Sequence, residues 1–155
     1  MDEEKVINRL NWFFALEASQ VDSYATQSKI VKDRYISLAL ARFACIEQTH
    51  VDNISGLIRS LGYVPTQTRD LISSSVGKLM GSITPSTGLI NMLRVDVAVE
   101  QKAKTDYKKF IDELSDKKLL NTLWANYVDE DLHTAWMKEQ IRFLTMEEEK
   151  KKLQL

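Results

Sequence analysis

Glycine and proline are scarce in this chain: its 155 residues include five glycines and two prolines. Both residues interrupt helices and are frequent in turns, so their scarcity favours long helices over a β-rich fold. The single cysteine, Cys45, excludes an internal disulfide and a cysteine-rich metal site. We predict that Cys45 is a small buried hydrophobic residue of a helix.

Long apolar runs and an excess of charge are also missing. The sequence has no uninterrupted apolar run long enough to span a membrane. Residues 1–4 are acidic and no apolar segment follows them, so we expect no secretory signal and a cytoplasmic protein. The net charge of −1 gives no electrostatic basis for binding nucleic acid. Hydrophobic residues make up 44% of the chain, enough for one soluble domain over residues 1–155.

The chain contains the same polar pattern twice. Each copy is a lone glutamate, followed thirty residues later by a Glu-x-x-His motif. The residues are Glu17, Glu47 and His50 in the first copy, and Glu100, Glu130 and His133 in the second. Positions i and i+3 share a face of a helix, so each motif presents a carboxylate and an imidazole to one point.

All six residues fall on apolar stripes with helical spacing. The stripes predict long helices over about residues 2–29, 34–61, 87–114 and 116–145, and a short helix over 68–80 in the connection between the second and third. We expect Asp2 and Ser115 to cap helices at their N-termini and Gly62 to end the second helix. Residues 147–152 should form a solvated helix end. A short link, a long crossover and a second short link predict an all-α, ferritin-like four-helix bundle.

Four glutamates on core-facing stripes need a physical solution, because a buried carboxylate is costly unless it is paired or bound to a metal. Carboxylates with one imidazole per ion suit iron or manganese. We therefore predict a dinuclear site. Its ligand sets are Glu17, Glu47 and His50 for one ion and Glu100, Glu130 and His133 for the other, with Glu47 and Glu130 bridging the two ions.

Neighbouring polar residues have two interpretations each. Asp129 is either the acceptor for the second N–H of His50 or a solvent-facing acid. Tyr24 and Tyr107 each follow a lone glutamate by seven residues; with Tyr127, they either line the site or are core tyrosines. Asp96, one turn before Glu100, lies beside the site or on the surface. The three tryptophans are expected to pack in the core: Trp12, Trp124 and Trp136.

These motifs resemble the ferritin-like di-iron superfamily, which includes bacterioferritin, rubrerythrin, the ribonucleotide reductase small subunit and demethoxyubiquinone hydroxylase. The Asp-Glu-x-x-His pattern of that superfamily is present at residues 129–133. Finer matches resemble the hydroxylase family: Glu17 followed by Tyr24 and Gln27, His50-Val51-Asp52, and Ala98-Val99-Glu100 followed by Tyr107.

The resemblance implies an oxidoreductase with two iron ions, or manganese in their place, that activates O₂ or H₂O₂. It would either reduce peroxide or oxygen, as rubrerythrins do, or hydroxylate a quinone-like substrate. No four-cysteine rubredoxin module is present, so a separate protein would donate the electrons. The crossover corresponds to a lipid-facing segment of the hydroxylases, which implies at most peripheral membrane contact through residues 68–83. We expect a homodimer formed through the first two helices.

Non-enzymatic iron binding is the alternative function. A ferritin-like protein that stores iron would oxidise Fe(II) in transit at the same centre, and a cage-forming oligomer would support this interpretation. A bundle that has lost its metal is disfavoured, because all six candidate ligands are intact.

Overall fold

The computed structural model describes residues 2–66 and 87–154. Four long helices make up almost all of this part of the chain: α1 (Glu3–Ile30), α2 (Arg34–Ser60), α5 (Leu89–Asp112) and α6 (Lys117–Leu153). No strand occurs among the described residues, and the predicted four-helix bundle is confirmed. The short helix predicted at 68–80 and the membrane contact predicted for 68–83 lie outside the described residues.

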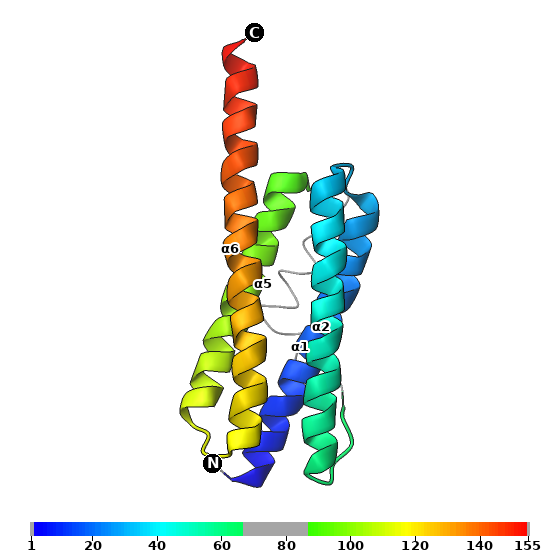
Figure 1. Ribbon diagram of the computed structural model, residues 1–155, viewed down its shortest axis with the longest axis vertical. Coiled ribbons are helices and arrows are strands. Elements are labelled where there is room, and N and C mark those ends of the chain that lie inside the picture. Colours follow the sequence, from blue (N-terminus) through cyan, green and yellow to red (C-terminus); the bar gives the residue numbers. More distant parts are fainter. Residues whose placement is uncertain (1, 67–86, 155) are drawn as a thin grey trace.

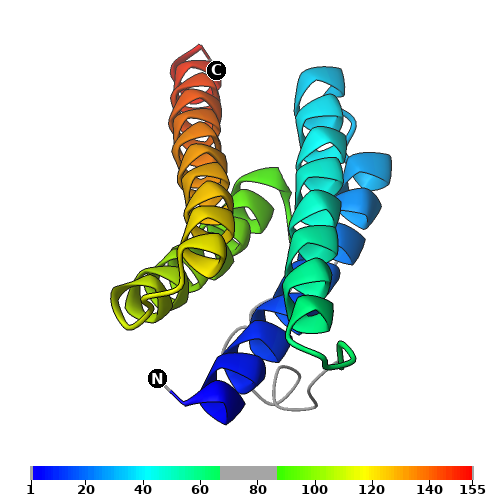
Figure 2. The same cartoon turned by 60° about the horizontal axis from the view of Figure 1, so that its bottom comes forward.

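The helices form two hairpins, in which α1 packs along α2 and α5 packs along α6. Figures 1 and 2 show the hairpins side by side with their inner faces opposed. Each hairpin turns through a short link, at residues 31–33 and 113–116. The first copy of the polar pattern lies on one hairpin and the second copy on the other, so the fold brings the two copies face to face.

Capping residues set where three of the helices begin. Asp2 and Asp33 accept the amide hydrogens of Lys5 and Ile36, each at 2.9 Å. The N-cap of α6 is Asp116, whose carboxylate accepts two amide hydrogens of the first turn at 2.9 Å. The prediction that Ser115 caps this helix is therefore wrong. The residue that caps is the one whose oxygen reaches the amides two and three positions on, and here that residue is Asp116.

Gly62 ends α2, as predicted. Its φ is +87°, a left-handed conformation that glycine adopts without a Cβ clash. The amide of Tyr63 donates to the carbonyl of Ile58 at 3.2 Å, and that of Gly62 donates to Arg59 at 3.0 Å. These two bonds form the Schellman motif, which satisfies carbonyls that the helix end leaves free.

The last helix extends beyond its apolar stripe and includes residues 147–152, which were predicted to form a solvated helix end. α6 continues through Leu153, whereas the stripe predicted an end near residue 145, and its C-terminal part projects beyond the other three helices (Figure 1). Polar side chains support the extension, since Lys150 pairs with Glu147 at 2.9 Å. The apolar stripe gives no signal there, because the projecting turns have no core to face.

Two hydrophobic clusters fill the bundle, one on either side of the polar residues. The Phe13 cluster is formed by buried residues from the first half of α1, the end of α2, the second half of α5 and the start of α6. It includes Leu10, Ile54, Tyr107 and Phe110. The Phe43 cluster lies around Tyr24, Leu40, Leu93 and Met137. The six residues of the polar pattern thus sit in a layer between two apolar layers.

Two sequence-based expectations about packing are wrong. Cys45 is exposed rather than buried, because it lies about 200° around the helix from the core-facing Glu47. Trp124 is 50% exposed and packs edge-on against Tyr127 with ring centroids 5.2 Å apart. Trp12 and Trp136 are partly buried and pack against the Phe13 and Phe43 clusters respectively, as expected.

Candidate metal centre

Six ionisable side chains meet in the layer between the two hydrophobic clusters, and all of them are almost fully buried. The four glutamates have no exposed surface and the two histidines have 1% each. All four helices contribute: Glu17 from α1, Glu47 and His50 from α2, Glu100 from α5, and Glu130 and His133 from α6. The structure therefore brings together all six residues that the repeated pattern singles out.

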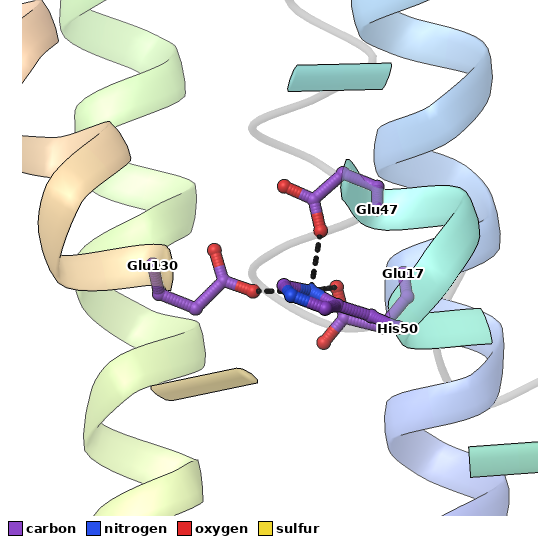
Figure 3. Close-up of side chains that lie close together, drawn as sticks. All are labelled: Glu17, Glu47, His50 and Glu130. Carbon is purple, nitrogen blue, oxygen red and sulfur yellow. Dashed lines mark hydrogen bonds and ion pairs between the residues drawn. The ribbon is translucent and has the colours of Figure 1, made fainter. Parts of the chain in front are cut away.

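The imidazole of His50 faces three carboxylates. Its Nδ1 atom lies 3.0 Å from Glu47 Oε2, 3.2 Å from Glu130 Oε1 and 3.6 Å from Glu17 Oε2. Figure 3 shows Glu130 reaching the ring from the side of the bundle opposite Glu47 and Glu17. One ligand atom from each of the four residues lies within 4.8 Å of the others, a spacing that could hold a metal ion.

The imidazole of His133 also faces three carboxylates. Its Nδ1 atom lies 3.0 Å from Glu47 Oε1 and 3.6 Å from both Glu100 Oε1 and Glu130 Oε2. Glu47, Glu100, Glu130 and His133 form a second group of ligand atoms within 4.8 Å of one another. In both groups the Nδ1 atom of the histidine is the one that points at the carboxylates.

Glu47 and Glu130 belong to both groups, and each divides its two oxygens between them. Glu47 directs Oε2 towards His50 and Oε1 towards His133. Glu130 directs Oε1 towards His50 and Oε2 towards His133. A carboxylate that bridges two cations needs this arrangement, with one oxygen on each side.

The chemistry of this donor set fits two divalent cations. Each glutamate keeps at least one buried oxygen that has no hydrogen-bond partner among the described residues: Glu17 Oε2, Glu47 Oε1, Glu100 Oε2 and both oxygens of Glu130. Four carboxylates carry four negative charges, which two divalent cations cancel if both histidines stay neutral. Two protonated histidines alone would leave half of that charge uncompensated in a dry site, at high cost.

The protonation of these groups reflects the same crowding. Burial, followed by the charge of Glu130, raises the pKa of Glu100 to about 8. Burial opposes the charged form of His133, but its close contacts with Glu100, Glu130 and Glu47 outweigh burial and raise its pKa to about 12. Protons and metal cations therefore compete for the same atoms.

Two tyrosines connect the hairpins across the bundle. The hydroxyl of Tyr24 on α1 donates to Glu100 Oε1 on α5, and the hydroxyl of Tyr107 on α5 donates to Glu17 Oε1 on α1. Each tyrosine thus contacts the lone glutamate of the other hairpin and not the one seven residues before it. These bonds orient Glu17 and Glu100, each of which belongs to only one of the two ligand groups. Tyr24 and Tyr107 were expected either to line the site or to be core tyrosines. In the structure both hydroxyls contact glutamates of the cluster.

The acid beside His50 has no counterpart beside His133. Asp129 Oδ2 lies 3.2 Å from His50 Nε2, so the ring nitrogen that faces away from the cluster has an acceptor. Nε2 of His133 has no hydrogen-bond partner among the described residues. Its ring packs instead against Phe43, with centroids 4.2 Å apart. The two halves of the site are therefore not equivalent.

Two further residues from the sequence analysis have clear positions. Tyr127 is partly buried, packs against the Phe13 cluster and contacts Trp124, rather than the carboxylates. Asp96 is buried at 3% exposure and accepts a hydrogen bond from Gln27 Nε2 at 2.9 Å. Burial raises the pKa of Asp96 to about 7, although the bond from Gln27 opposes this shift.

Sequence reasoning did not single out two buried amides. Asn126 donates to the hydroxyl of Tyr107 at 3.2 Å, and Gln20 is 1% exposed with no hydrogen-bond partner for its amide among the described residues. A signal was present for both: each is a polar residue on a stripe that also carries a candidate ligand. Gln20 follows Glu17 by three residues and Asn126 precedes Glu130 by four.

Comparison with known proteins gives three findings. Residues 15–152 match the sequence profile of the family described as "Ubiquinone biosynthesis protein COQ7". A search of curated proteins finds no match. The fold is similar to that of the bacterioferritin-related protein from Bacteroides fragilis, described as a dodecameric thioferritin, with a TM-score of 0.80 and 15% sequence identity over 97% of this chain and 92% of that one. This structural similarity concerns the fold alone.

Proposed function

This chain belongs to the COQ7 family, a ferritin-like di-iron family, and from that premise we propose that it is a di-iron oxygenase. Its buried cluster would hold two iron ions, and its reaction would be hydroxylation of a quinone-like aromatic ring by O₂. Family membership supports a di-iron oxidoreductase in general. The finer assignment, to ring hydroxylation, is our proposal.

One observation carries the proposal: the oxygens of Glu47 and Glu130 are divided between the two histidines. Each bridging carboxylate offers one oxygen to the side of His50 and the other to the side of His133. We assign Glu17 and His50 to one iron, Glu100 and His133 to the other, and Glu47 and Glu130 to both. This assignment uses all six residues, and four carboxylates balance two divalent ions.

The reaction needs a redox-active pair of metals, because no side chain here can activate O₂; bound iron would supply that chemistry. In the overall balance, one oxygen atom enters a ring C–H bond as a hydroxyl group. The other leaves as water after uptake of two electrons and two protons. The protein must therefore hold the ring beside the centre, admit protons and keep bulk water out.

Specific side chains would perform the protein's part of this work. The hydroxyls of Tyr24 and Tyr107 orient Glu100 and Glu17. Asp129 accepts the N–H of His50 Nε2 and so keeps Nδ1 of that ring available as a ligand. Phe43 and the apolar residues around it cover His133. Because each layer adjoining the cluster is hydrophobic, charge inside it interacts strongly.

The two electrons would come from outside the chain. Its one cysteine cannot hold an iron–sulfur or rubredoxin site, so a separate reductant or donor protein is part of the proposal. Asp129, which contacts His50 from outside the cluster, has 41% of its side chain exposed to solvent. Protons would have their shortest route to the cluster from this side.

The direct experiment combines metal analysis with turnover. Protein produced in iron-replete medium should contain two irons per chain, and the reduced protein should be reoxidised by O₂. A short-chain quinone-like substrate incubated with reductant and isotopically labelled O₂ should then gain one labelled oxygen atom. Two irons without labelled product would exclude ring hydroxylation of that substrate. Absence of iron in native protein and in Glu130→Ala alike would overturn the metal assignment.

Iron storage is a second candidate, because the fold is similar to that of a dodecameric thioferritin. A storage protein would take up iron well beyond two ions per chain and would assemble into a cage. We propose the smaller assembly, a homodimer formed through α1 and α2. Light scattering of the purified chain, with iron uptake measured on the same sample, separates the two functions.

A further inference from the structure

The two hairpins repeat the candidate ligands and one tyrosine with a constant offset of 83 positions. Glu17 and Glu100, Tyr24 and Tyr107, Glu47 and Glu130, and His50 and His133 are all separated by this number. The offset also pairs residues that differ in chemistry. Position 13 is phenylalanine where position 96 is aspartate, and position 27 is glutamine where position 110 is phenylalanine. The two members of each such pair lie at opposite ends of the cluster, with Phe13 and Phe110 at one end and Gln27 and Asp96 at the other.

Aromatic rings close the end beyond Tyr107. Phe13 stacks on Tyr107 with ring centroids 4.0 Å apart, and the centroids of Phe13 and Phe110 are 5.9 Å apart. Phe13, Tyr107 and Phe110 are at most 1% exposed. The Tyr107 hydroxyl at this end is already bonded, since it donates to Glu17 and accepts from Asn126, and the rings beyond it serve packing.

The end beyond Tyr24 carries a buried polar pair instead. Gln27 is 2% exposed and Asp96 is 3% exposed. The Gln27 amide donates one hydrogen to Asp96 Oδ1 at 2.9 Å and the other to Ser23 Oγ at 3.1 Å. Both amide hydrogens are thereby used. Gln27 Oε1 and Asp96 Oδ2 are left as buried acceptors with no hydrogen-bond partner among the described residues.

A cavity lies one helical turn from this pair. Its volume is about 330 Å³, within the range of small-molecule sites. Met92 lines the cavity and precedes Asp96 by four residues, whereas Ile30 and Val31 line it and follow Gln27 by three and four. Leu89 adds a fourth apolar side chain, and Lys32 and Asp33 supply the charge in the lining. The arrangement is a partly open, mainly apolar pocket, one helical turn along α1 and α5 from two buried acceptors that do not themselves line it.

We propose that Gln27 and Asp96 form the polar end of the substrate site, where their two free oxygens accept hydroxyl hydrogens from an aromatic ring in its hydroquinone form. The apolar substituents of the ring would occupy the cavity between the α1–α2 link and the start of α5. This assignment rests on the function proposed above and adds to it the two residues that select the substrate. It also fixes the side of approach, which is that of Tyr24 and Glu100.

Gln27 Oε1 and Asp96 Oδ2 are acceptors that lack donors, so this site should select a ring that carries hydroxyl groups. A hydroquinone brings two O–H donors, whereas a quinone or an aryl ether brings only acceptors. A quinone carbonyl placed against Gln27 Oε1 and Asp96 Oδ2 would leave all of these atoms unpaired in a dry site. Sites that hydrogen-bond a substrate hydroxyl discriminate strongly against analogues without it, because their own buried groups are then unsatisfied.

Binding measurements test this assignment without turnover. The full chain is loaded with Zn²⁺, which is redox-inert, and titrated calorimetrically without oxygen at about pH 8. The probes are a pentyl-substituted hydroquinone, its dimethyl ether and the corresponding quinone. The hydroquinone should bind at least about tenfold more tightly than the other two, since it alone satisfies a charged acceptor.

Variants identify the residues responsible. Asp96→Asn and Gln27→Met should each weaken hydroquinone binding at least about tenfold, and change ether binding by less than about twofold. Asp106→Asn is the matched control, since Asp106 is also a buried aspartate of α5, at 6% exposure, but pairs with Lys102. It should leave all three affinities unchanged. Circular dichroism and zinc content confirm that each variant is folded and loaded.

Equal affinities for the three probes would overturn the proposal, and so would equal losses in Asp96→Asn and Asp106→Asn. Failure of the proposed function is a separate result. If the variants show the expected losses while native protein holds no iron, the subsite is correct and the di-iron function is wrong. If native protein holds two irons and hydroxylates a ring while both variants bind the hydroquinone normally, the function is correct and this subsite is wrong.

Discussion

The carboxylate of Asp129 lies 3.2 Å from Nε2 of His50 and directs Nδ1 of the same ring towards the glutamates. No comparable acceptor is present for Nε2 of His133 among the described residues. A carboxylate in this position fixes the tautomer of a metal-binding histidine and raises its basicity. The two sides of the centre should therefore bind metal with different affinities.

Replacing Asp129 should weaken metal binding on the His50 side. We expect Asp129→Asn to lower the affinity for the first or second Mn²⁺ ion about 10- to 100-fold, because an amide accepts the N–H more weakly than a carboxylate does. Competition against a chromogenic chelator measures both affinities. Asp131→Asn is the control, since Asp131 pairs with Lys104 on the surface and is two residues away. Equal effects of the two variants would contradict the role given to Asp129.

Loss of a bridging carboxylate should change stability in opposite directions with and without metal. In chelator, Glu47→Gln should be more stable than the native chain, because it removes one of four mutually repelling carboxylates from a crowded, buried site. With Mn²⁺ present, the native chain should gain stability by mass action and the variant should not. Urea unfolding under both conditions measures this. An exposed counterpart, Glu139→Gln, should show neither effect; a variant destabilised under both conditions would mean that Glu47 has a structural role.

The two cross-bundle tyrosines should differ in their contribution to the free energy of unfolding, although each donates one hydrogen bond to a glutamate. Tyr107→Phe removes the donor for Glu17 and also the acceptor for Asn126, whereas Tyr24→Phe removes only the donor for Glu100. Each buried group left unsatisfied costs about 1–3 kcal/mol. Tyr107→Phe should thus lower the free energy of unfolding more than Tyr24→Phe. Denaturant titration measures the free energy of unfolding of both variants. A larger loss in Tyr24→Phe than in Tyr107→Phe would contradict this prediction.

The fold was readily predictable, because helices buried on one face carry apolar residues every three or four positions and this spacing is visible in the sequence. The stripes placed the starts of α1 and α2 within a residue of their observed positions. They failed at the end of α6, where Phe143 is 55% exposed and Leu153 88% exposed, since helix that projects into solvent needs no apolar stripe. The N-cap of α6 was predicted wrongly for a different reason: Ser115 and Asp116 are adjacent and both are good N-cap residues.

The members of the site were predictable, but their partners were not. Six ionisable residues on buried stripes are unusual enough to identify from spacing alone. Sequence placed Tyr24 near Glu17, yet its hydroxyl bonds Glu100 on the other hairpin. Contacts across a bundle depend on the axial offset between the two hairpins. The spacing of residues within one helix gives no information about that offset. For the same reason, the bond between Gln27 and Asp96 could not be inferred.

The projecting end of α6 should contribute little to the stability of the bundle. Most of residues 147–154 are exposed, and their side-chain pairs are surface ion pairs of small value. Deleting the residues after Met146 should therefore change the free energy of unfolding by no more than about 0.5 kcal/mol. Met137→Ala, in the fully buried part of the same helix, should cost about 2–5 kcal/mol by comparison. A loss of similar size on truncation would show that the projecting turns are packed against something.

The buried carboxyl of Asp96 should make stability depend on pH in a direction unusual for an aspartate. Its pKa of about 7 in the folded chain exceeds the ordinary aspartate value of 3.8, chiefly because of burial. The folded state then holds the proton more tightly than the unfolded state, so the contribution of Asp96 to stability falls as pH rises from about 4 to about 7 and is constant above. A shift of this size corresponds to as much as about 4 kcal/mol.

Comparing variants isolates this contribution from that of the other buried acids. Asp96→Asn cannot titrate at this position, so the native chain should lose stability relative to it between about pH 4.5 and about pH 7.5 when both are unfolded in urea with chelator present. Gln27→Ala tests the cause. The bond from Gln27 lowers the pKa of Asp96, so its removal should raise that pKa further and extend the loss to higher pH. If native and Asp96→Asn proteins keep a constant difference across this range, Asp96 is ionised in both the folded and the unfolded state.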